Sequence, residues 1–265
     1  MKPWLFFRRE RSALSWPAGC LMGVAGAVSV ASMDASAGMC SARSAAHATP
    51  VVELYTSEGC SSCPPADRWL SGLKNRSDVV ALAYHVDYWD RLGWKDRFAS
   101  PAFTQRQYEQ QSLNGARFAY TPQVVVDGRD RKDWPRASVG AQPAQAPVSI
   151  ELSRSTGTTG DISFSATVTV VGNAPQRIAA YWAVTESGHR TAVKSGENEG
   201  ATLEHDFVVR EHEAVPAWAA VRSEPKTLTH SVRLPADAAH SRRVNLVVVD
   251  ATTGRPLQAL ALDCS

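Results

Sequence analysis

Two short apolar runs and one amphipathic stretch organise the first half of the chain. Residues 51–56 read Val-Val-Glu-Leu-Tyr-Thr, and residues 79–86 form a nearly continuous apolar run, typical of a strand buried on both faces of a sheet. Between them, four apolar residues recur with the spacing of one helix face: Ala66, Trp69, Leu70 and Leu73. A strand, a helix and a strand within about 35 residues predict a βαβ unit with two parallel strands.

Capping and turn residues mark the next elements. Ser100-Pro101 predicts a helix start, with the serine as N-cap and the proline at the first helical position, and Asn114-Gly115 predicts its end near Leu113. Residues 123–127, Gln-Val-Val-Val-Asp, predict a strand that Asp127-Gly128 closes with a tight turn.

The pattern changes after residues 135–147, a segment with three prolines and little periodicity that we interpret as a linker. No clear amphipathic helix follows it. Short strand-like runs separated by turn residues predict an all-β sandwich, and they lie at residues 148–152, 162–171, 178–184, 203–209, 226–234, 244–249 and 257–262.

The N-terminus has the layout of a secretory signal. Basic residues up to Arg11 precede the apolar stretch 17–31, and Ala35-Ser36-Ala37 has the small-x-small form of a cleavage site. A membrane anchor is the alternative, but 15 apolar positions interrupted by proline and glycine fall short of the roughly 20 that a spanning helix needs. We expect a periplasmic or secreted protein without a membrane span after cleavage.

Composition and charge narrow the possible partners. The chain has 265 residues, 44% of them hydrophobic and 20% charged, which is typical of a globular protein. Its net charge of +2 argues against a dedicated nucleic-acid binder, which usually has a strongly basic face.

Signal cleavage would leave four cysteines, and an even number in an oxidising compartment indicates disulfides. Cys60 and Cys63 are the natural local pair. We therefore predict a second bridge between Cys40 and Cys264, which would tie the two ends of the mature chain together. The alternative is that these two terminal thiols are free.

The segment Ser57–Asp67 carries the chemistry. It places a Cys-x-x-Cys pair between the predicted strand 51–56 and the following helix, which is typical of a thioredoxin-like redox motif. Helix amides favour a thiolate at Cys60, which attacks a substrate disulfide, and Cys63 resolves the mixed disulfide. Two alternatives to this redox role remain open: the pair could be a structural disulfide, or it could bind copper or zinc together with His85.

Several motifs resemble a family of secreted bacterial thioredoxin-like proteins that is filed as a domain of unknown function. The longest is Val-Val-Glu-Leu-Tyr-Thr-Ser-Glu-Gly-Cys-Ser-Ser-Cys-Pro-Pro-Ala-Asp at residues 51–67. Further similar segments lie at residues 85–96, 120–128, 196–200 and 205–210. The resemblance covers about residues 50–262 and implies a thioredoxin-like α/β domain followed by a β domain. It implies no substrate, because the family has no assigned reaction.

By resemblance to thioredoxins, Pro122 would be the cis-proline that faces the disulfide, and the Thr121 backbone would pair with a substrate peptide. The ordinary alternative is a trans turn proline. The chain also departs from thioredoxin. Glu58 is a negative charge that opposes thiolate formation at Cys60, and Pro64-Pro65 delays the helix start to Cys63 or Pro64.

His85, Asp87 and the loop 87–99 lie at or just after the end of a strand at the predicted carboxyl edge of the sheet, and they are candidates for further functions. His85 or Asp87 would move a proton for the resolving cysteine, although strand-end residues of this kind often only bond loop amides. Aromatic residues in loop 87–99 predict either a peptide-binding wall or lid, or a loop packed on its own domain. Acidic and histidine residues between 197 and 212 lack tight ligand spacing, and we interpret them as a solvated hairpin.

Together these patterns predict an exported thiol–disulfide oxidoreductase that needs no cofactor. Its partners would be the thiols or disulfides of exported proteins and an unidentified redox partner. Two classes compete with it: a copper- or zinc-binding or delivery module that uses Cys60, Cys63 and possibly His85, and a non-catalytic interaction protein with a structural disulfide. The predicted organisation is a signal peptide (1–37), an N-terminal segment (38–49), a thioredoxin-like domain (50–134), a linker (135–147) and a β-sandwich-like domain (148–265).

Overall fold

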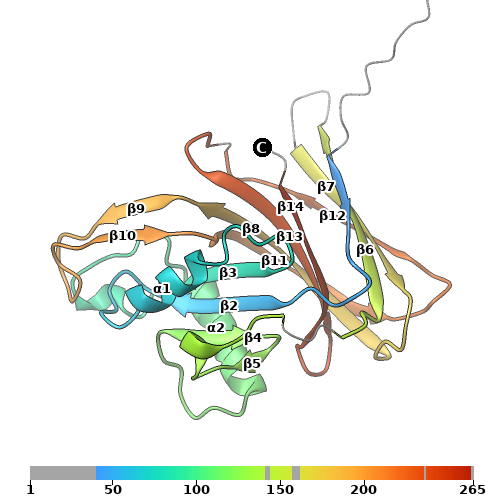
Figure 1. Cartoon of the computed structure of the whole chain (residues 1–265), viewed down its shortest axis with the longest axis horizontal. Coiled ribbons are helices and arrows are strands. Elements are labelled where there is room, and N and C mark those ends of the chain that lie inside the picture. The colour runs from blue at the N-terminus through green and yellow to red at the C-terminus, as the bar shows by residue number, and fades with distance from the viewer. Residues whose placement is uncertain (1–39, 141–143, 157–161, 236, 264–265) are drawn as a thin grey trace, which may run out of the picture. The chain divides into compact units, whose positions relative to one another are not determined.

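The computed structural model describes residues 40–140, 144–156, 162–235 and 237–263 (Figure 1). The predicted signal peptide lies outside these residues, and so does Cys264 of the predicted Cys40–Cys264 bridge. The Sγ of Cys40 lies 3.8 Å from the carbonyl oxygen of Asp263, so both ends of the described chain meet. No helix in the described ranges is long and apolar enough to cross a membrane.

Strands make up 45% of the structure and helices 13%. The described α-helices are α1 (Pro64–Ser71) and α2 (Pro101–Leu113), and short 3-10 helices lie at Asp90–Leu92 and Trp134–Arg136. The strands are β1 (Ser41–Arg43), β2 (Val51–Thr56), β3 (Val80–His85), β4 (Gln123–Val126), β5 (Arg129–Asp130), β6 (Val148–Thr156), β7 (Ile162–Val170), β8 (Arg177–Ser187), β9 (His189–Ala192), β10 (Thr202–His205), β11 (Val208–Ala219), β12 (Lys226–Ser231), β13 (Ser241–Asp250) and β14 (Pro256–Asp263).

The local predictions for residues 51–128 are confirmed. β2 and β3 are parallel and α1 connects them, and α2 begins after Ser100, whose hydroxyl accepts a bond from the Ala102 N–H at 3.3 Å. At the turn between β4 and β5, Asp127 and Gly128 both have positive φ angles, of 50° and 72°. Two successive positive φ angles are what a tight hairpin turn needs.

Strand β2 is buried on both faces because each face is covered by a helix. Val52 and Leu54 pack with Leu70 of α1 in one apolar cluster. Val51 and Tyr55 belong to the cluster that includes Phe103 of α2, on the other side of the sheet. Alternate residues of a strand point to opposite faces, so one short run supplies both cores.

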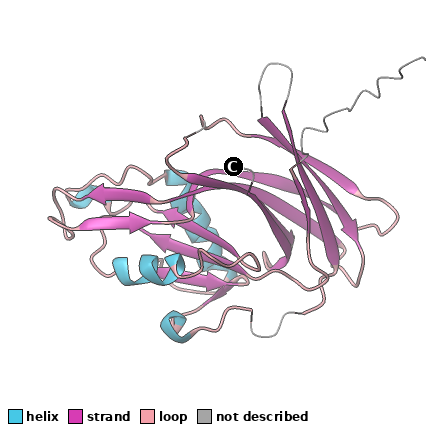
Figure 2. Ribbon diagram, turned by 45° about the horizontal axis from the view of Figure 1, so that its top comes forward, coloured by secondary structure: helices cyan, strands magenta, loops and turns pink. Residues whose placement is uncertain are grey.

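The predicted fold class, a thioredoxin-like α/β half followed by an all-β sandwich, is wrong. One mixed sheet of eight strands, in the order β14-β13-β8-β11-β3-β2-β4-β5, draws strands from both sides of residues 135–147 (Figures 1 and 2). β11 joins it by parallel pairing of Val208 with Ala83. The domain boundaries themselves stay a prediction.

The physical reason for this error lies in β8 and β13. A sandwich strand has one solvated face, whereas β8 is buried at every position from 180 to 187 and β13 at every position from 244 to 249. Such continuous burial means that the sheet is covered on both faces. One face packs Trp182 and Leu246 against the four-stranded sheet β1-β6-β7-β12, and the other face packs Tyr181 in the cluster of Phe103. Trp182 is thus a core residue.

The run predicted as one strand at residues 203–209 is two strands. β9 and β10 form a hairpin that leaves the large sheet after β8 and returns to it at β11. The chain bends at Gly188 and Phe207, whose φ angles are 88° and 57°. This hairpin runs alongside α1 in Figure 1, and its loop therefore reaches the Cys60–Cys63 segment.

Candidate functional site

The Cys60–Cys63 pair lies between the end of β2 and the start of α1. The two cysteines form a disulfide, with their Cα atoms 5.4 Å apart, and the Cys63 N–H donates to the Cys60 carbonyl at 3.1 Å. Cys63 is the N-cap residue of α1, and Pro64 and Pro65 open the helix. The prediction that the prolines delay the helix start is confirmed, so Cys60 lies in the loop before it.

A second segment, directly before strand β4, lies beside the disulfide. The Thr121–Pro122 peptide is cis. The Thr121 hydroxyl donates to the Sγ of Cys60 at 3.3 Å, and the indole N–H of Trp89 donates to that hydroxyl at 2.8 Å. The structure therefore places the Thr121–Pro122 segment beside Cys60 and Cys63, where the resemblance to thioredoxins had put it.

The loop of the β9–β10 hairpin covers the disulfide loop. The Asn198 side-chain amide donates to the carbonyl oxygens of Glu58 at 2.8 Å and Cys60 at 3.0 Å. A carboxylate oxygen of Glu197 accepts from the Ser61 N–H at 3.0 Å and from its hydroxyl at 2.8 Å. The exposed fraction of both cysteines is 0%. Glu197 and Asn198 are functional candidates that the sequence analysis missed, although they lie in the 196–200 motif.

His85 and Asp87 have separate surroundings. The Nδ1 of His85 lies 2.6 Å from Oδ2 of Asp96, and the same oxygen accepts from the Glu58 N–H at 2.9 Å. His85 is thereby linked to the disulfide loop through Asp96. The carboxylate of Asp87 instead accepts from the hydroxyl of Thr104 on α2 at 2.6 Å. Among the described residues, neither side chain bonds a sulfur.

Five ionisable side chains are buried together behind the disulfide loop: Glu58, Asp67, His85, Asp96 and His205. The Nε2 of His205 lies 3.3 Å from Oε1 of Glu58, and the rings of His85 and His205 are 5.0 Å apart. His205 was predicted in a solvated hairpin, which is wrong because β10 turns it inward against α1. The only sequence signal for this cluster was the mixture of acids and histidines.

Burial and pairing set the charges in this cluster. Burial alone would raise the pKa of Asp96, but the attraction and hydrogen bond of His85 and two backbone N–H groups lower it to about 2. Burial lowers the pKa of His85, and its attraction to Asp96 outweighs this and leaves the pKa raised. For Asp67 burial dominates and raises the pKa. For Glu58 the effect of burial is outweighed by the nearby imidazole of His205 and by Thr191 and Trp94, and the pKa is lowered.

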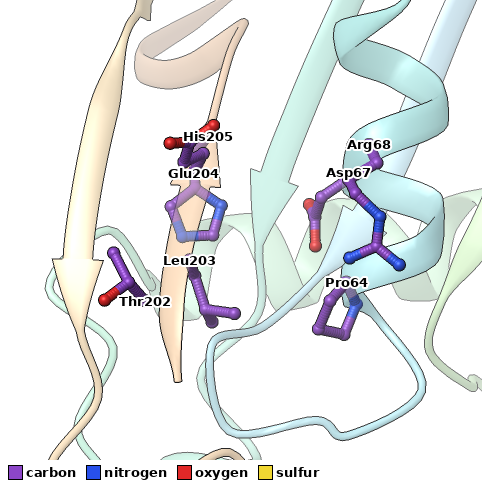
Figure 3. Close-up of a pocket in the computed structure, with 7 residues that line it drawn as sticks. All are labelled: Pro64, Asp67, Arg68, Thr202, Leu203, Glu204 and His205. Atoms are coloured by element: carbon purple, nitrogen blue, oxygen red, sulfur yellow. The ribbon is translucent and has the colours of Figure 1, made fainter. Parts of the chain in front are cut away.

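A cavity of about 120 Å³ lies beside this cluster. Figure 3 shows the carboxylate of Asp67 and the imidazole of His205 facing each other across it, between α1 and β10. The other residues that line it are Pro64, Arg68, Thr202, Leu203 and Glu204. A space of this size with polar walls has room for several water molecules.

The aromatic loop packs on its own protein and also touches the disulfide loop. Phe98 is buried against His85, and the Trp94 indole N–H donates to the Glu58 carboxylate at 2.8 Å. The packed-loop interpretation therefore describes Phe98 and Trp94. No group of three His, Cys, Asp or Glu side chains in the described part of the chain has an arrangement that could hold a metal ion.

Comparisons with known proteins found two similar solved structures and one matching family. The crystal structure of protein AGR_C_4864 from Agrobacterium tumefaciens is 27% identical, with a TM-score of 0.57 over 82% of this chain and 94% of that one. HBP35 of Porphyromonas gingivalis is 13% identical, with a TM-score of 0.60 over 83% of this chain and 76% of that one, and it shares the fold alone. No curated protein matches. The family model described as "Protein of unknown function (DUF1223)" matches residues 51–250, and the chain therefore belongs to this family.

Proposed function

We propose that this protein exchanges thiols and disulfides with exported protein partners through Cys60 and Cys63. The observation that carries the proposal is the Cys60–Cys63 disulfide at the junction of β2 and α1, with the Thr121 hydroxyl on the Cys60 sulfur. Export is inferred from the signal-like residues 1–37, and an oxidising compartment is where such disulfides persist.

The exchange is a balanced two-electron reaction. The thiolate of reduced Cys60 attacks one sulfur of a partner disulfide, so that a bond to Cys60 forms while the partner bond breaks and releases a partner thiolate. The Cys63 thiolate then attacks the Cys60 sulfur, which restores the Cys60–Cys63 bond and frees the second partner thiol. The partner gains the two electrons that the pair loses, and the reverse sequence oxidises a partner dithiol.

Two features of the surroundings support this chemistry. The Glu58 carboxylate is turned to Trp94 and His205, which reduces the repulsion that it exerts on a thiolate at Cys60. The Nε2 of His85 is buried and has no hydrogen-bond partner among the described residues. This nitrogen is the better candidate for proton transfer to or from Cys63, because the Asp87 carboxylate is engaged by Thr104.

A structural clip is the second candidate, and the complete burial of both cysteines favours it. The reduction potential of the pair separates the two functions. We would measure it by alkylation and mass spectrometry after equilibration in glutathione buffers. A value between about −120 and −270 mV supports exchange, while a pair that stays oxidised below about −300 mV is a clip.

A variant without both sulfurs tests whether the pair has an exchange activity or a structural role. The double variant Cys60→Ser, Cys63→Ser is expected to remain folded and to lose all exchange with a model protein disulfide. A variant that loses stability while the wild-type protein shows no exchange either would support the clip instead.

A further inference from the structure

The disulfide is closed off by the protein's own chain. The tip of the β9–β10 hairpin, which we define as residues Gly196–Gly200, lies over the turn that contains both sulfurs. A sulfur with no exposed surface cannot be approached in line by a partner sulfur. If the proposed function holds, part of the chain around this turn must therefore move before exchange begins, and the tip is a segment that bonds the turn at three residues.

The tip bonds the Glu58 carbonyl and the Ser61 N–H, and it adds a second bond to the Cys60 carbonyl, which already accepts from the Cys63 N–H. Asn198 supplies a donor to the carbonyls of Glu58 and Cys60, and Glu197 supplies an acceptor to the Ser61 N–H. An extended peptide offers the same two groups, one N–H donor and one C=O acceptor in each residue. Thr121 and Pro122 border this surface, because the Ser62 hydroxyl donates to the Thr121 carbonyl at 3.5 Å.

We propose that the tip holds the place of an extended peptide segment of the protein partner, and that the Glu58–Ser61 backbone is the surface that binds this segment. The inference rests on the proposed function and adds the chemical class of the partner, which is a polypeptide that pairs through the backbone beside its cysteine. A small thiol makes no such bonds and reacts only when the tip is open.

The hairpin is built so that the tip can move while its strands stay in place. Four residue pairs join β9 to β10, and Lys74, in the turn after α1, forms an ion pair with Asp206 at 2.7 Å. The tip itself begins and ends with glycines whose φ angles are 80° and 82°. Its opening therefore breaks the bonds to the disulfide loop and leaves the paired strands against α1.

The first test measures how fast dithiothreitol reduces the Cys60–Cys63 disulfide. We expect Asn198→Ala to accelerate reduction about tenfold, because it removes two bonds that hold the tip. We expect Glu197→Gln to accelerate it at least threefold, because the amide oxygen can still accept from Ser61 but without the negative charge that strengthens both bonds. Glu199→Gln is the matched control, since it removes the same charge from the tip and the Glu199 side chain bonds none of the described residues. Its rate should stay within twofold of wild type.

Failure of the inference and failure of the proposed function look different in this assay. Equal rates for the wild type and all three variants would overturn the role of the tip while leaving exchange intact. A disulfide that dithiothreitol reduces only in denaturant, in the wild type and in every variant, would overturn the proposed function and the inference together.

The second test concerns the occupant. Oxidised protein is mixed with a ten-residue peptide that has one central cysteine, and with the same peptide N-methylated at the two residues beside that cysteine. We expect the unmodified peptide to form the mixed disulfide about tenfold faster, after both rates are normalised by reaction with a small aromatic disulfide. Equal normalised rates would overturn backbone pairing as the mode of binding.

Discussion

The buried pair of His85 and Asp96 gives the sharpest prediction about stability. The change is Asp96→Asn. The carboxylate accepts bonds through both oxygens, from His85 and the Glu58 N–H on Oδ2 and from the Phe98 N–H on Oδ1. An amide has one acceptor oxygen, so the variant leaves one of these positions without an acceptor and leaves His85 without its counter-charge.

The magnitude follows from the pKa of Asp96. A fall from 3.8 to about 2 corresponds to roughly 2.5 kcal/mol, since one pKa unit equals about 1.4 kcal/mol. Removal of one partner from a buried ion pair usually costs about 3–5 kcal/mol. We therefore expect Asp96→Asn to lower the free energy of unfolding by about 3 kcal/mol at pH 5.5.

The dependence on pH has a defined sign. The pKa of Asp96 is lowered in the folded protein, so its stabilisation is present above about pH 4 and is lost as the pH falls toward 2. The pKa of His85 is raised, so its stabilisation is present below about pH 6.5 and is lost as the pH rises through the raised value. The difference between wild type and variant should thus be largest between about pH 4 and 6.5.

Urea unfolding followed by tryptophan fluorescence at a series of pH values measures this difference. Asp133→Asn is the matched control, because Asp133 pairs with Arg131 at the surface and its loss should not change the midpoint measurably. A variant Asp96→Asn with the wild-type midpoint at pH 5.5, or with a difference that does not change between pH 5.5 and 2.5, would refute the reasoning.

Three further outcomes are expected. Arg106→Leu should lower the free energy of unfolding, measured in urea, by at least about 3 kcal/mol. The variant leaves the buried Glu53 carboxylate with only the hydroxyls of Tyr55 and Tyr181 among the described residues, and an unchanged urea midpoint would contradict the ion pair. Leu54→Ala should cost about 2–5 kcal/mol and leave a single transition in fluorescence and circular dichroism, whereas two separate transitions would show that the strands of the large sheet do not unfold together. Gly196→Ala should speed reduction of the disulfide more than Gly200→Ala. Both glycines have positive φ angles, but only a Cβ at residue 196 would contact Trp94, at 3.3 Å. Equal reduction rates would contradict this contact.

The sequence predicted what depends on neighbouring residues. Ser100, Pro101 and Asn114 defined both ends of α2, because caps act within one turn. The cysteine spacing predicted the disulfide for the same reason. The architecture depended on pairing between residues 125 positions apart, Ala83 and Val208, and no local pattern specifies such a partner. The continuous burial of β8 was visible as Ile-Ala-Ala-Tyr-Trp-Ala-Val, which we interpreted as a sandwich strand although it does not alternate.

The residues of the site also fall into those that local motifs predicted and those that only the tertiary structure brings in. Cys60, Cys63, Thr121 and Pro122 stood in recognisable motifs, whereas Asn198 and His205 reach the disulfide loop through the hairpin. A hairpin's direction relative to its sheet is decided by single bends, here Gly188 and Phe207, and Phe207 is a residue type for which a positive φ is not expected. This is why the acidic and histidine residues of 197–205 gave no signal for a contact with α1.

The parallel pairing of β11 with β3 limits how the protein can be shortened. A fragment that ends at residue 134 contains the cysteines, α1 and α2, yet it lacks the strands that complete the sheet beside β3. The Ala83 N–H would then lose the Phe207 carbonyl that it bonds at 2.8 Å, and this edge of β3, Val-Ala-Leu-Ala-Tyr, has no charged residue to prevent strand addition. Such a fragment is expected to aggregate, so redox studies of the cysteine pair require the chain through β14.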